Sequence, residues 1–215
     1  MSGALTHHAG GAFLGLVVGE AAMLSGAWDL RSTLAMAAVS TVTAGGLLSQ
    51  DFDNGALWKL LDKWIPDEWL GAGGPLQHRG ILHWVAWPFV IAWLWHRWIG
   101  LGYALPVAAP WAGYGLAVGW GSHLILDFIY GKRVIHPEGG GIIVRAGVPL
   151  FPWWGHIGGL WTSSGIGSQT AGLALGVGTV TELNHLGVVY QTQVGLLVLI
   201  AAASVFSWLF IPAHR

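Results

Sequence analysis

The chain has 215 residues and a formal net charge of −1, and 54% of its residues are hydrophobic whereas only 9% are charged. Soluble domains carry about 25% charged residues, so the composition excludes an ordinary soluble domain and favours a protein embedded in lipid. The sequence contains no basic patch, phosphate-binding glycine loop or dinucleotide motif, and no nucleic-acid partner is expected. The lack of cysteine excludes disulfides, thiolate zinc sites and cysteine nucleophiles.

The apolar segments predict an all-α fold, a polytopic membrane helical bundle of about five transmembrane helices in a single domain covering 1–215. Each segment has roughly 20 residues, which is enough to cross ~30 Å of hydrocarbon. No basic residue precedes the first segment, so a cleaved signal peptide is not expected, and His7 and His8 should remain in the mature protein. The predicted spans are 9–28, 33–49, 80–99, 105–130 and 192–211.

Polar loops join the predicted spans, and the longest cover 50–79 and 131–191. The first mixes tryptophan with lysine, which is typical of a segment lying along lipid headgroups, and most of the 15 tryptophans are interpreted as interfacial anchors. The second is predicted to be a long irregular loop between the fourth and fifth spans. Within it, 171–189 is apolar enough for a packed or re-entrant helix, but the polar residues from Thr181 to His185 argue against a sixth span.

Five alternating crossings place the polar residues asymmetrically. His7 and both long loops fall on one side, whereas Asp29, Arg31, Arg97 and the C-terminus fall on the other. The side with His7 also carries most of the lysines and arginines, so the positive-inside rule predicts that it faces the cytoplasm. The expected location is therefore the cytoplasmic (inner) membrane of a bacterium or archaeon. The residues with metal-ligand chemistry on this side are His7, Asp51, Asp53, His78, His83, His123 and Asp127.

Small residues recur every four positions on three predicted helices, and each series reaches a possible ligand. On a helix, residues four apart lie on one face, and small side chains there let helix backbones approach closely in a bilayer. Ordinary helix packing is the alternative explanation of these series. The three series are Gly11, Gly15 and Gly19 after His7; Thr41, Gly45 and Ser49 before Asp53; and Gly115 and Gly119 before His123 and Asp127.

Imidazole and carboxylate groups without thiolates suit zinc, with manganese or iron as alternatives, and their number allows one or two ions. Ions in such a site activate water and stabilise the leaving oxygen of a phosphoester, so the predicted chemistry is metal-assisted hydrolysis. Each motif also has a structural interpretation. Asp51 and Asp53 could cap a helix, His78 and His83 could contact lipid headgroups, and His123 with Asp127 could form a hydrogen-bonded pair within the bundle.

The order of these motifs resembles the YdjM-like inner-membrane proteins, a family described as metal-dependent hydrolases. The resemblance covers most of residues 6 to about 165. It implies that the seven possible ligands surround a metal centre, with Asp127, Asp51 and Arg79 as the catalytic candidates. The matching features are Thr6-His7, Leu47-Leu48 with Asp51-x-Asp53, His78-Arg79-Gly80 with His83, Ser122-His123 with Asp127 and Gly131, and Val148-Pro149-Leu150-Phe151.

The chain departs from the family pattern around several of these residues. Asn54 replaces the histidine that follows the Asp-x-Asp pair, Leu82 and Trp84 flank the second histidine, and Tyr130 replaces a threonine after Asp127. The residues that surround metal ligands orient them and set affinity and activity. The resemblance therefore implies a retained metal site with altered surroundings.

The predicted function is zinc-dependent cleavage of a phosphoester by a membrane hydrolase, with membrane lipid as its environment and a lipid or lipid-linked phosphoester as substrate. One alternative is a non-catalytic metal-binding scaffold or partner-binding subunit. A transporter is the other alternative, although no inverted repeat is evident. Glu20, in the middle of the first predicted span, is predicted to pair with His96 or Arg97.

Overall fold

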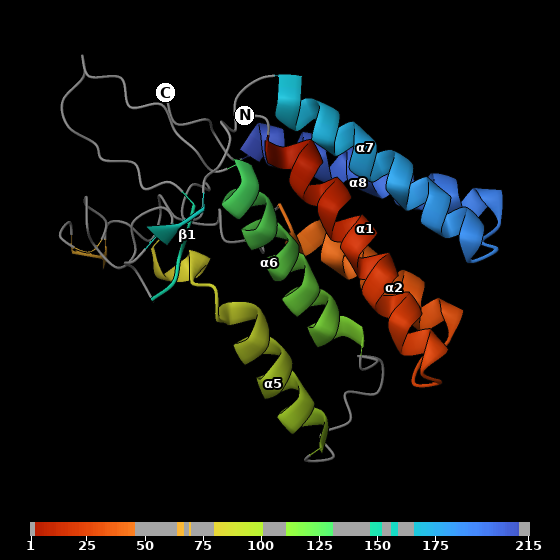
Figure 1. The fold of residues 1–215 in the computed structure, drawn as a ribbon, viewed down its shortest axis with the longest axis horizontal. Helices are drawn as coiled ribbons and strands as arrows, with labels where there is room; N and C mark the ends of the chain where they lie inside the picture. Colours follow the sequence, from red (N-terminus) through yellow and green to blue (C-terminus); the bar gives the residue numbers. More distant parts are fainter. Residues whose placement is uncertain are drawn as a thin grey trace.

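The computed structural model describes residues 3–45, 64–66, 69, 80–100, 111–130, 147–151, 156–158 and 166–210. This part of the chain is mostly helical, which confirms the predicted all-α class (Figure 1). A three-residue 3-10 turn, η3 (Ile81–His83), precedes the third long helix, and two short strands, β1 (Val148–Pro149) and β2 (His156–Ile157), pair antiparallel. The helices are α1 (Gly3–Leu24), α2 (Leu30–Thr43), α5 (Trp87–Gly100), α6 (Trp111–Tyr130), α7 (Ile166–His185) and α8 (Tyr190–Phe210).

Five of these helices match the predicted spans, and α7 does not. The prediction of an irregular loop over 131–191 is wrong for α7, a regular helix of 20 residues that packs along α1, whereas the packed helix considered for 171–189 agrees with the structure. Its polar residues find partners within the fold: Thr181 donates a hydrogen bond to the carbonyl of Val177 one turn earlier, and His185 pairs with Glu20 of α1. The polar end of α7 is therefore compatible with a packed helix.

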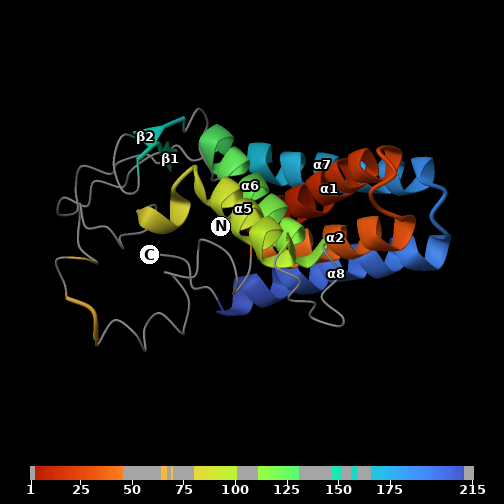
Figure 2. The ribbon, with the colours of Figure 1, turned by 90° about the horizontal axis from the view of Figure 1, so that it is seen from below.

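The helices form two adjacent rows, as Figure 2 shows. One row contains α1 beside α7, and the other contains α2 beside α8, with α6 against α1 and α2 and α5 against α6. Both strands and η3 lie at one end of this arrangement, which is also the end at which α1 begins and α6 finishes (Figure 1). We call it the strand end of the bundle.

A tight connection at the opposite end joins α1 to α2. Gly26 has a φ of +76°, which an L side chain rarely adopts, and Asp29 then caps α2 by accepting a hydrogen bond from the backbone N–H of Ser32 at 2.7 Å. The hydroxyl of Ser32 and, to a smaller extent, its backbone N–H donate hydrogen bonds to the Asp29 carboxylate. These bonds hold the pKa of Asp29 below its ordinary value.

The glycine series predicted on α1 and α6 are packing surfaces against α2. A Cβ at Gly15 would lie 2.7 Å from the Cα of Ala37, and a Cβ at Gly119 would lie 2.7 Å from the carbonyl oxygen of Ser40. Ser40, buried between the two helices, donates a hydrogen bond to the carbonyl of Gly115 at 3.0 Å. Small residues thus let α2 lie in close backbone contact with both α1 and α6.

The last helix returns to the strand end. Ser207 near the end of α8 contacts His8 in the first turns of α1, so the prediction that the chain finishes on the side opposite His7 is wrong for α8. The additional helix α7 reverses the direction of α8 relative to a five-helix topology. Among the described residues, one helix is long and apolar enough to cross a membrane, judged by length and composition alone. This candidate span covers residues 190–207 of α8, and 22% of it is buried.

Glu20 has a different partner from the one predicted. Its carboxylate lies 3.1 Å from Nε2 of His185 on α7, whereas His96 on α5 lies 2.9 Å from the hydroxyl of Tyr114 on α6. The prediction was wrong because α1 is flanked by α7 at this position, so α5 contacts α6 instead.

Candidate metal centre

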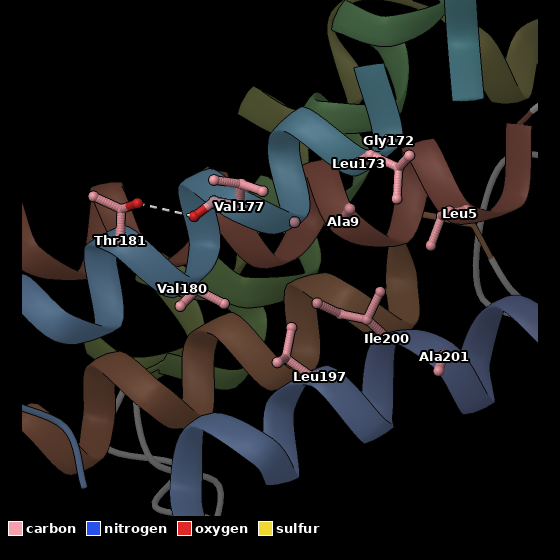
Figure 3. Close-up of a pocket in the computed structure, with 11 residues that line it drawn as sticks. Leu5, Ala9, Gly172, Leu173, Val177, Val180, Thr181, Leu197, Ile200 and Ala201 are labelled. Carbon is pink, nitrogen blue, oxygen red and sulfur yellow. Dashed lines mark hydrogen bonds between the residues drawn. The ribbon is translucent and has the colours of Figure 1, made fainter. Parts of the chain in front are cut away.

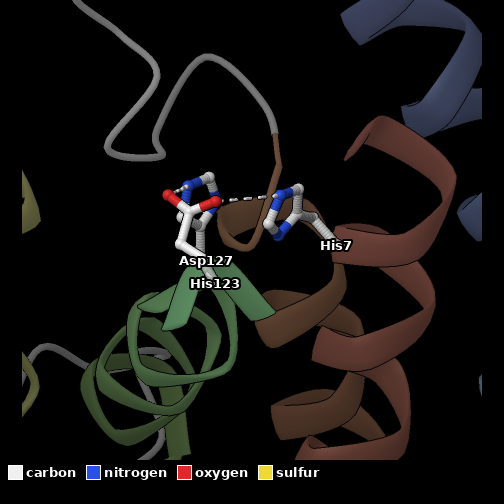
Figure 4. A group of neighbouring side chains, drawn as sticks. All are labelled: His7, His123 and Asp127. Carbon is white, nitrogen blue, oxygen red and sulfur yellow. Dashed lines mark ion pairs between the residues drawn. The ribbon is translucent and has the colours of Figure 1, made fainter. Parts of the chain in front are cut away.

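Three separate elements bring imidazole and carboxylate groups together at the strand end. His7 lies near the start of α1, His83 is the last residue of η3, and His123 and Asp127 lie one turn apart near the end of α6. Figure 4 shows His7 facing His123 and Asp127 across the gap between α1 and α6. All four residues are buried, with exposed fractions of 9%, 0%, 1% and 6% in chain order.

Each of the three histidines places Nε2 near a carboxylate oxygen of Asp127, and the ligand atoms of His7, His123 and Asp127 are close enough together to share one ion. Nε2 of His83 and Nε2 of His123 lie 3.4 and 3.5 Å from Oδ2 of Asp127, and Nε2 of His7 lies 3.9 Å from Oδ1. Hydrogen bonds between such atoms are shorter, about 2.7–3.2 Å. Two ligand atoms of a tetrahedral zinc ion, each about 2.0–2.1 Å from the metal, lie about 3.3 Å apart. The separations therefore fit shared coordination better than direct hydrogen bonding.

The imidazole rings are packed against each other. The rings of His7 and His123 are stacked with centroids 4.0 Å apart and planes 14° apart, and the ring of His83 meets that of His123 edge-on at 5.4 Å. Two charged imidazolium rings stacked at this distance would repel each other, so the stacking disfavours a positive charge on both rings at once. Neutral imidazole is the form that binds a metal ion.

The orientation of His123 is fixed by the end of α2. Its Nδ1 lies 2.6 Å from the carbonyl oxygen of Ala44, and since a carbonyl can only accept, Nδ1 carries the proton. The other nitrogen, Nε2, then carries the lone pair on the side of Asp127, whose Oδ2 lies 3.5 Å away. A backbone carbonyl that orients a histidine in this way is a regular feature of metal sites.

Other carbonyls at the end of α2 bind the neighbouring elements. The final carbonyls of a helix have no partner within it, and they form the negative end of the helix dipole. The carbonyl of Thr41 lies 2.6 Å from Nδ1 of His8, and the carbonyl of Gly45 accepts a hydrogen bond from Ser207. Because this negative end adjoins His123, it favours a positive ion in the site.

Four of the seven predicted ligands are thus brought together. The buried group of His7, His123 and Asp127, whose ligand atoms lie within 4.8 Å of one another, can hold a metal ion, and His83 extends it. Asp51, Asp53, His78 and Arg79 lie outside the described residues. The structure describes the small-residue series before Asp53 as far as Gly45. A Cβ added to Gly45 would lie 3.1 Å from Cβ of His7, so this glycine is packed against the candidate site.

His8 was not among the predicted site residues, although it is fully buried beside the centre. Its ring contacts the carbonyl of Thr41 through Nδ1 and the hydroxyl of Ser207 through Nε2, at 2.6 and 2.8 Å. It therefore joins α1, α2 and α8 next to His7. The adjacent pair His7-His8 is the sequence signal that could have identified this role. Neighbouring residues on a helix face different partners, so only one of the two histidines can face the candidate site directly.

A separate hollow lies between α1, α7 and α8 (Figure 3). It has a volume of about 450 Å³ and an almost entirely apolar lining that includes Leu5, Ala9, Leu173 and Leu197. Its one hydroxyl, on Thr181, donates to the carbonyl of Val177 within α7. Among the residues that the structure describes, the lining of the hollow therefore contains no titratable group, unlike the cluster of His7, His83, His123 and Asp127.

No family model, no curated protein and no solved structure matches the chain.

Proposed function

We propose that the chain is a polytopic membrane hydrolase that uses a metal ion, zinc by preference, to cleave a phosphoester in a lipid or lipid-linked substrate. The observation that carries the proposal is the spacing of His7, His83 and His123 around Asp127, at 3.4–3.9 Å between the paired atoms. Three imidazoles and one carboxylate form a ligand set that zinc accepts. Zinc bound there would polarise a phosphoryl oxygen and activate water.

Asp127 is the residue on which the proposed centre depends. Its Oδ1 faces His7 and its Oδ2 faces both His83 and His123, so we assign it the role of ligand in preference to that of general base. Its single negative charge offsets part of the charge of a divalent ion, and the end of α2 adds further negative potential. His123 contributes a lone pair whose direction is set by Ala44.

The membrane environment is part of the proposal and is supported by the outer faces of the bundle. Large apolar side chains are exposed along α5, α7 and α8, among them Phe89, Trp93, Leu173 and Val198. The exposure of so many large apolar side chains is unfavourable in water and suits contact with lipid chains. We propose that all six long helices lie within or across the bilayer.

The distribution of basic residues supports a cytoplasmic site. In the sequence, six of the nine lysines and arginines come between α2 and η3 or between α6 and β1, after helices that end at the strand end, whereas Arg31 and Arg97 lie at the other end. Under the positive-inside rule this distribution supports our proposal that the strand end faces the cytoplasm. A phosphoester on the inner leaflet would reach the site laterally, without leaving the membrane.

The test is zinc content and turnover of the purified protein in detergent. We expect bound zinc in a stoichiometric amount and hydrolysis of a generic phosphodiester, with both lost in His123→Ala and in Asp127→Asn. His185→Ala is the matched control, because His185 is 70% exposed and lies at the opposite end of the bundle. Equal zinc content in His123→Ala would refute the site. Bound zinc without turnover on a broad panel of phosphoesters would favour the metal-binding scaffold.

A further inference from the structure

Three tryptophans converge on the short turn that carries His83. The indole N–H of Trp87 donates to the carbonyl of Ile81 at 2.6 Å, and the indole N–H of Trp120 donates to the carbonyl of Leu82 at 3.1 Å. The indole of Trp84 donates to the carbonyl of Leu150, beside β1, at 3.0 Å. The rings also contact each other, with centroids 6.2 Å apart for Trp84 and Trp87 and 6.5 Å apart for Trp87 and Trp120.

His83 needs such support more than the other site histidines. His7 and His123 lie on helices of 22 and 20 residues, whereas η3 has three residues and a single turn of hydrogen bonding. A 3-10 turn has poorer hydrogen-bond geometry than an α-helix and holds its shape less well alone. The two carbonyls bound by indoles belong to Ile81 and Leu82, the two residues immediately before His83.

We propose that Trp87 and Trp120 are positioning residues for His83, holding the η3 backbone so that the imidazole reaches the metal centre. This inference rests on the proposed function for its purpose, although the hydrogen bonds themselves are independent of it. Their indoles have polar partners within the protein, so membrane anchoring, the role predicted for most tryptophans here, does not account for them. A tryptophan that only anchors a protein at the headgroups would direct its N–H outward to water or lipid.

Trp120 also sets the register between η3 and α6. It lies three residues before His123 on α6, so one helix supplies two site residues and the donor that holds the third. Residues three apart on a helix are neighbours on its surface. On the other flank of His83, the N–H of Val85 donates to the carbonyl of Pro149 at 3.2 Å, which ties the turn to β1. The position of His83 is thus defined from both sides.

The first test measures the accessibility of His83 in metal-free protein, so it does not depend on catalysis. Diethyl pyrocarbonate modifies accessible imidazoles, and mass spectrometry gives the rate at each histidine. The exposed His185 serves as an internal reference. We expect His83, which is fully buried in the wild type, to react several-fold faster in Trp120→Phe and in Trp87→Phe, because each change removes one indole donor but keeps an aromatic ring.

Trp93→Phe is the matched control, since Trp93 is 61% exposed on α5 and should leave His83 unreactive. If Trp120→Phe does not fold, as judged by helical circular dichroism, Trp87→Phe answers the same question. An unchanged rate at His83 in the folded variants would overturn the proposal. Acceleration at His83 in a protein that binds no zinc would retain the positioning role while refuting the proposed function.

The second test asks whether Trp120 acts through His83 or through general stability. Removing a residue that orients a metal ligand costs about 10–100-fold in metal affinity, so Trp120→Phe should weaken zinc binding by that amount. In a His83→Ala background the same substitution should have no further effect, because the residue that it positions is gone. Equal losses in both backgrounds would show a purely structural role and would contradict the proposal.

Discussion

Nδ1 of His123 on α6 lies 2.6 Å from the carbonyl oxygen of Ala44, the residue that follows α2. This contact uses one ring nitrogen for packing between helices and leaves the other for the metal centre. The two nitrogens can therefore be tested separately.

His123→Asn should keep the packing contact and abolish metal binding. The amide nitrogen of asparagine is as many bonds from the backbone as Nδ1, so it can donate to Ala44, but it has no atom in place of Nε2. We expect the variant to fold but to melt below wild type without zinc, because the ring contacts with His7 and His83 are lost, and to show no increase with zinc. Wild type should gain about 2.7 kcal/mol when free zinc exceeds the dissociation constant 100-fold. Zinc stabilisation of the variant equal to that of wild type would contradict the ligand role.

Gly119→Ala should separate α6 from α2. The added Cβ would overlap the hydroxyl of Thr43 and the backbone of Ser40, and backbone atoms cannot rotate away. Overpacking of this kind costs about 1–3 kcal/mol or more. Gly176→Ala on α7 is the matched control, because nothing lies within 4 Å of its Cβ and alanine is favoured over glycine in a helix by about 0.5–1 kcal/mol. Unfolding in detergent measures both, and equal stability of the two variants would contradict the packing that we describe.

Ser207→Ala should loosen α8 at the strand end. The hydroxyl of Ser207 joins Nε2 of His8 at 2.8 Å to the carbonyl of Gly45, and all three groups are buried. Leaving buried polar groups without this hydroxyl costs about 1–3 kcal/mol. Ser204→Ala, on the same helix, removes only a bond to the carbonyl of Ile200 one turn earlier and should change stability by less than about 0.5 kcal/mol. Equal effects at the two positions would show that the contact with His8 is unimportant.

Asp29 should make the connection between α1 and α2 sensitive to acid. Because hydrogen bonds from Ser32 lower its pKa in the folded protein, its stabilising contribution is complete above the unfolded-state pKa of about 3.9. The contribution is lost as the pH falls through the lower folded-state pKa. Asparagine caps a helix about as well as aspartate but does not titrate in this range. Melting curves against pH should therefore show wild type losing stability relative to Asp29→Asn only in strong acid, and parallel curves would refute the prediction.

Several features of the fold follow from local sequence and were predicted correctly. The helices α1, α2, α5, α6 and α8 appear where long apolar segments occur, because helix formation and burial depend on residues close together in the chain. The four-residue spacing of Gly115, Gly119, His123 and Asp127 predicted a single helix face, which is buried in the structure. His7 and Asp127 were expected at the same end of the bundle because consecutive helices run in opposite directions.

The sequence pattern did not predict which distant segments contact each other. Apolar periodicity gives each helix a buried face but does not say which neighbour covers it, so Glu20 was assigned to α5 when α7 is its partner. The same limit applied to α7, because the sequence allowed a packed helix within 171–189 but gave no neighbour for it.

The sequence by itself determined the ligand types, their position at one end of apolar helices and the small residues that allow close packing, since these depend on residue chemistry and helical period. Only the tertiary structure decided that Ala44 orients His123, that indoles hold the turn of His83, and that His8 joins three helices. Each of these is a hydrogen bond between groups far apart in the chain, and its geometry exists only after the helices have packed.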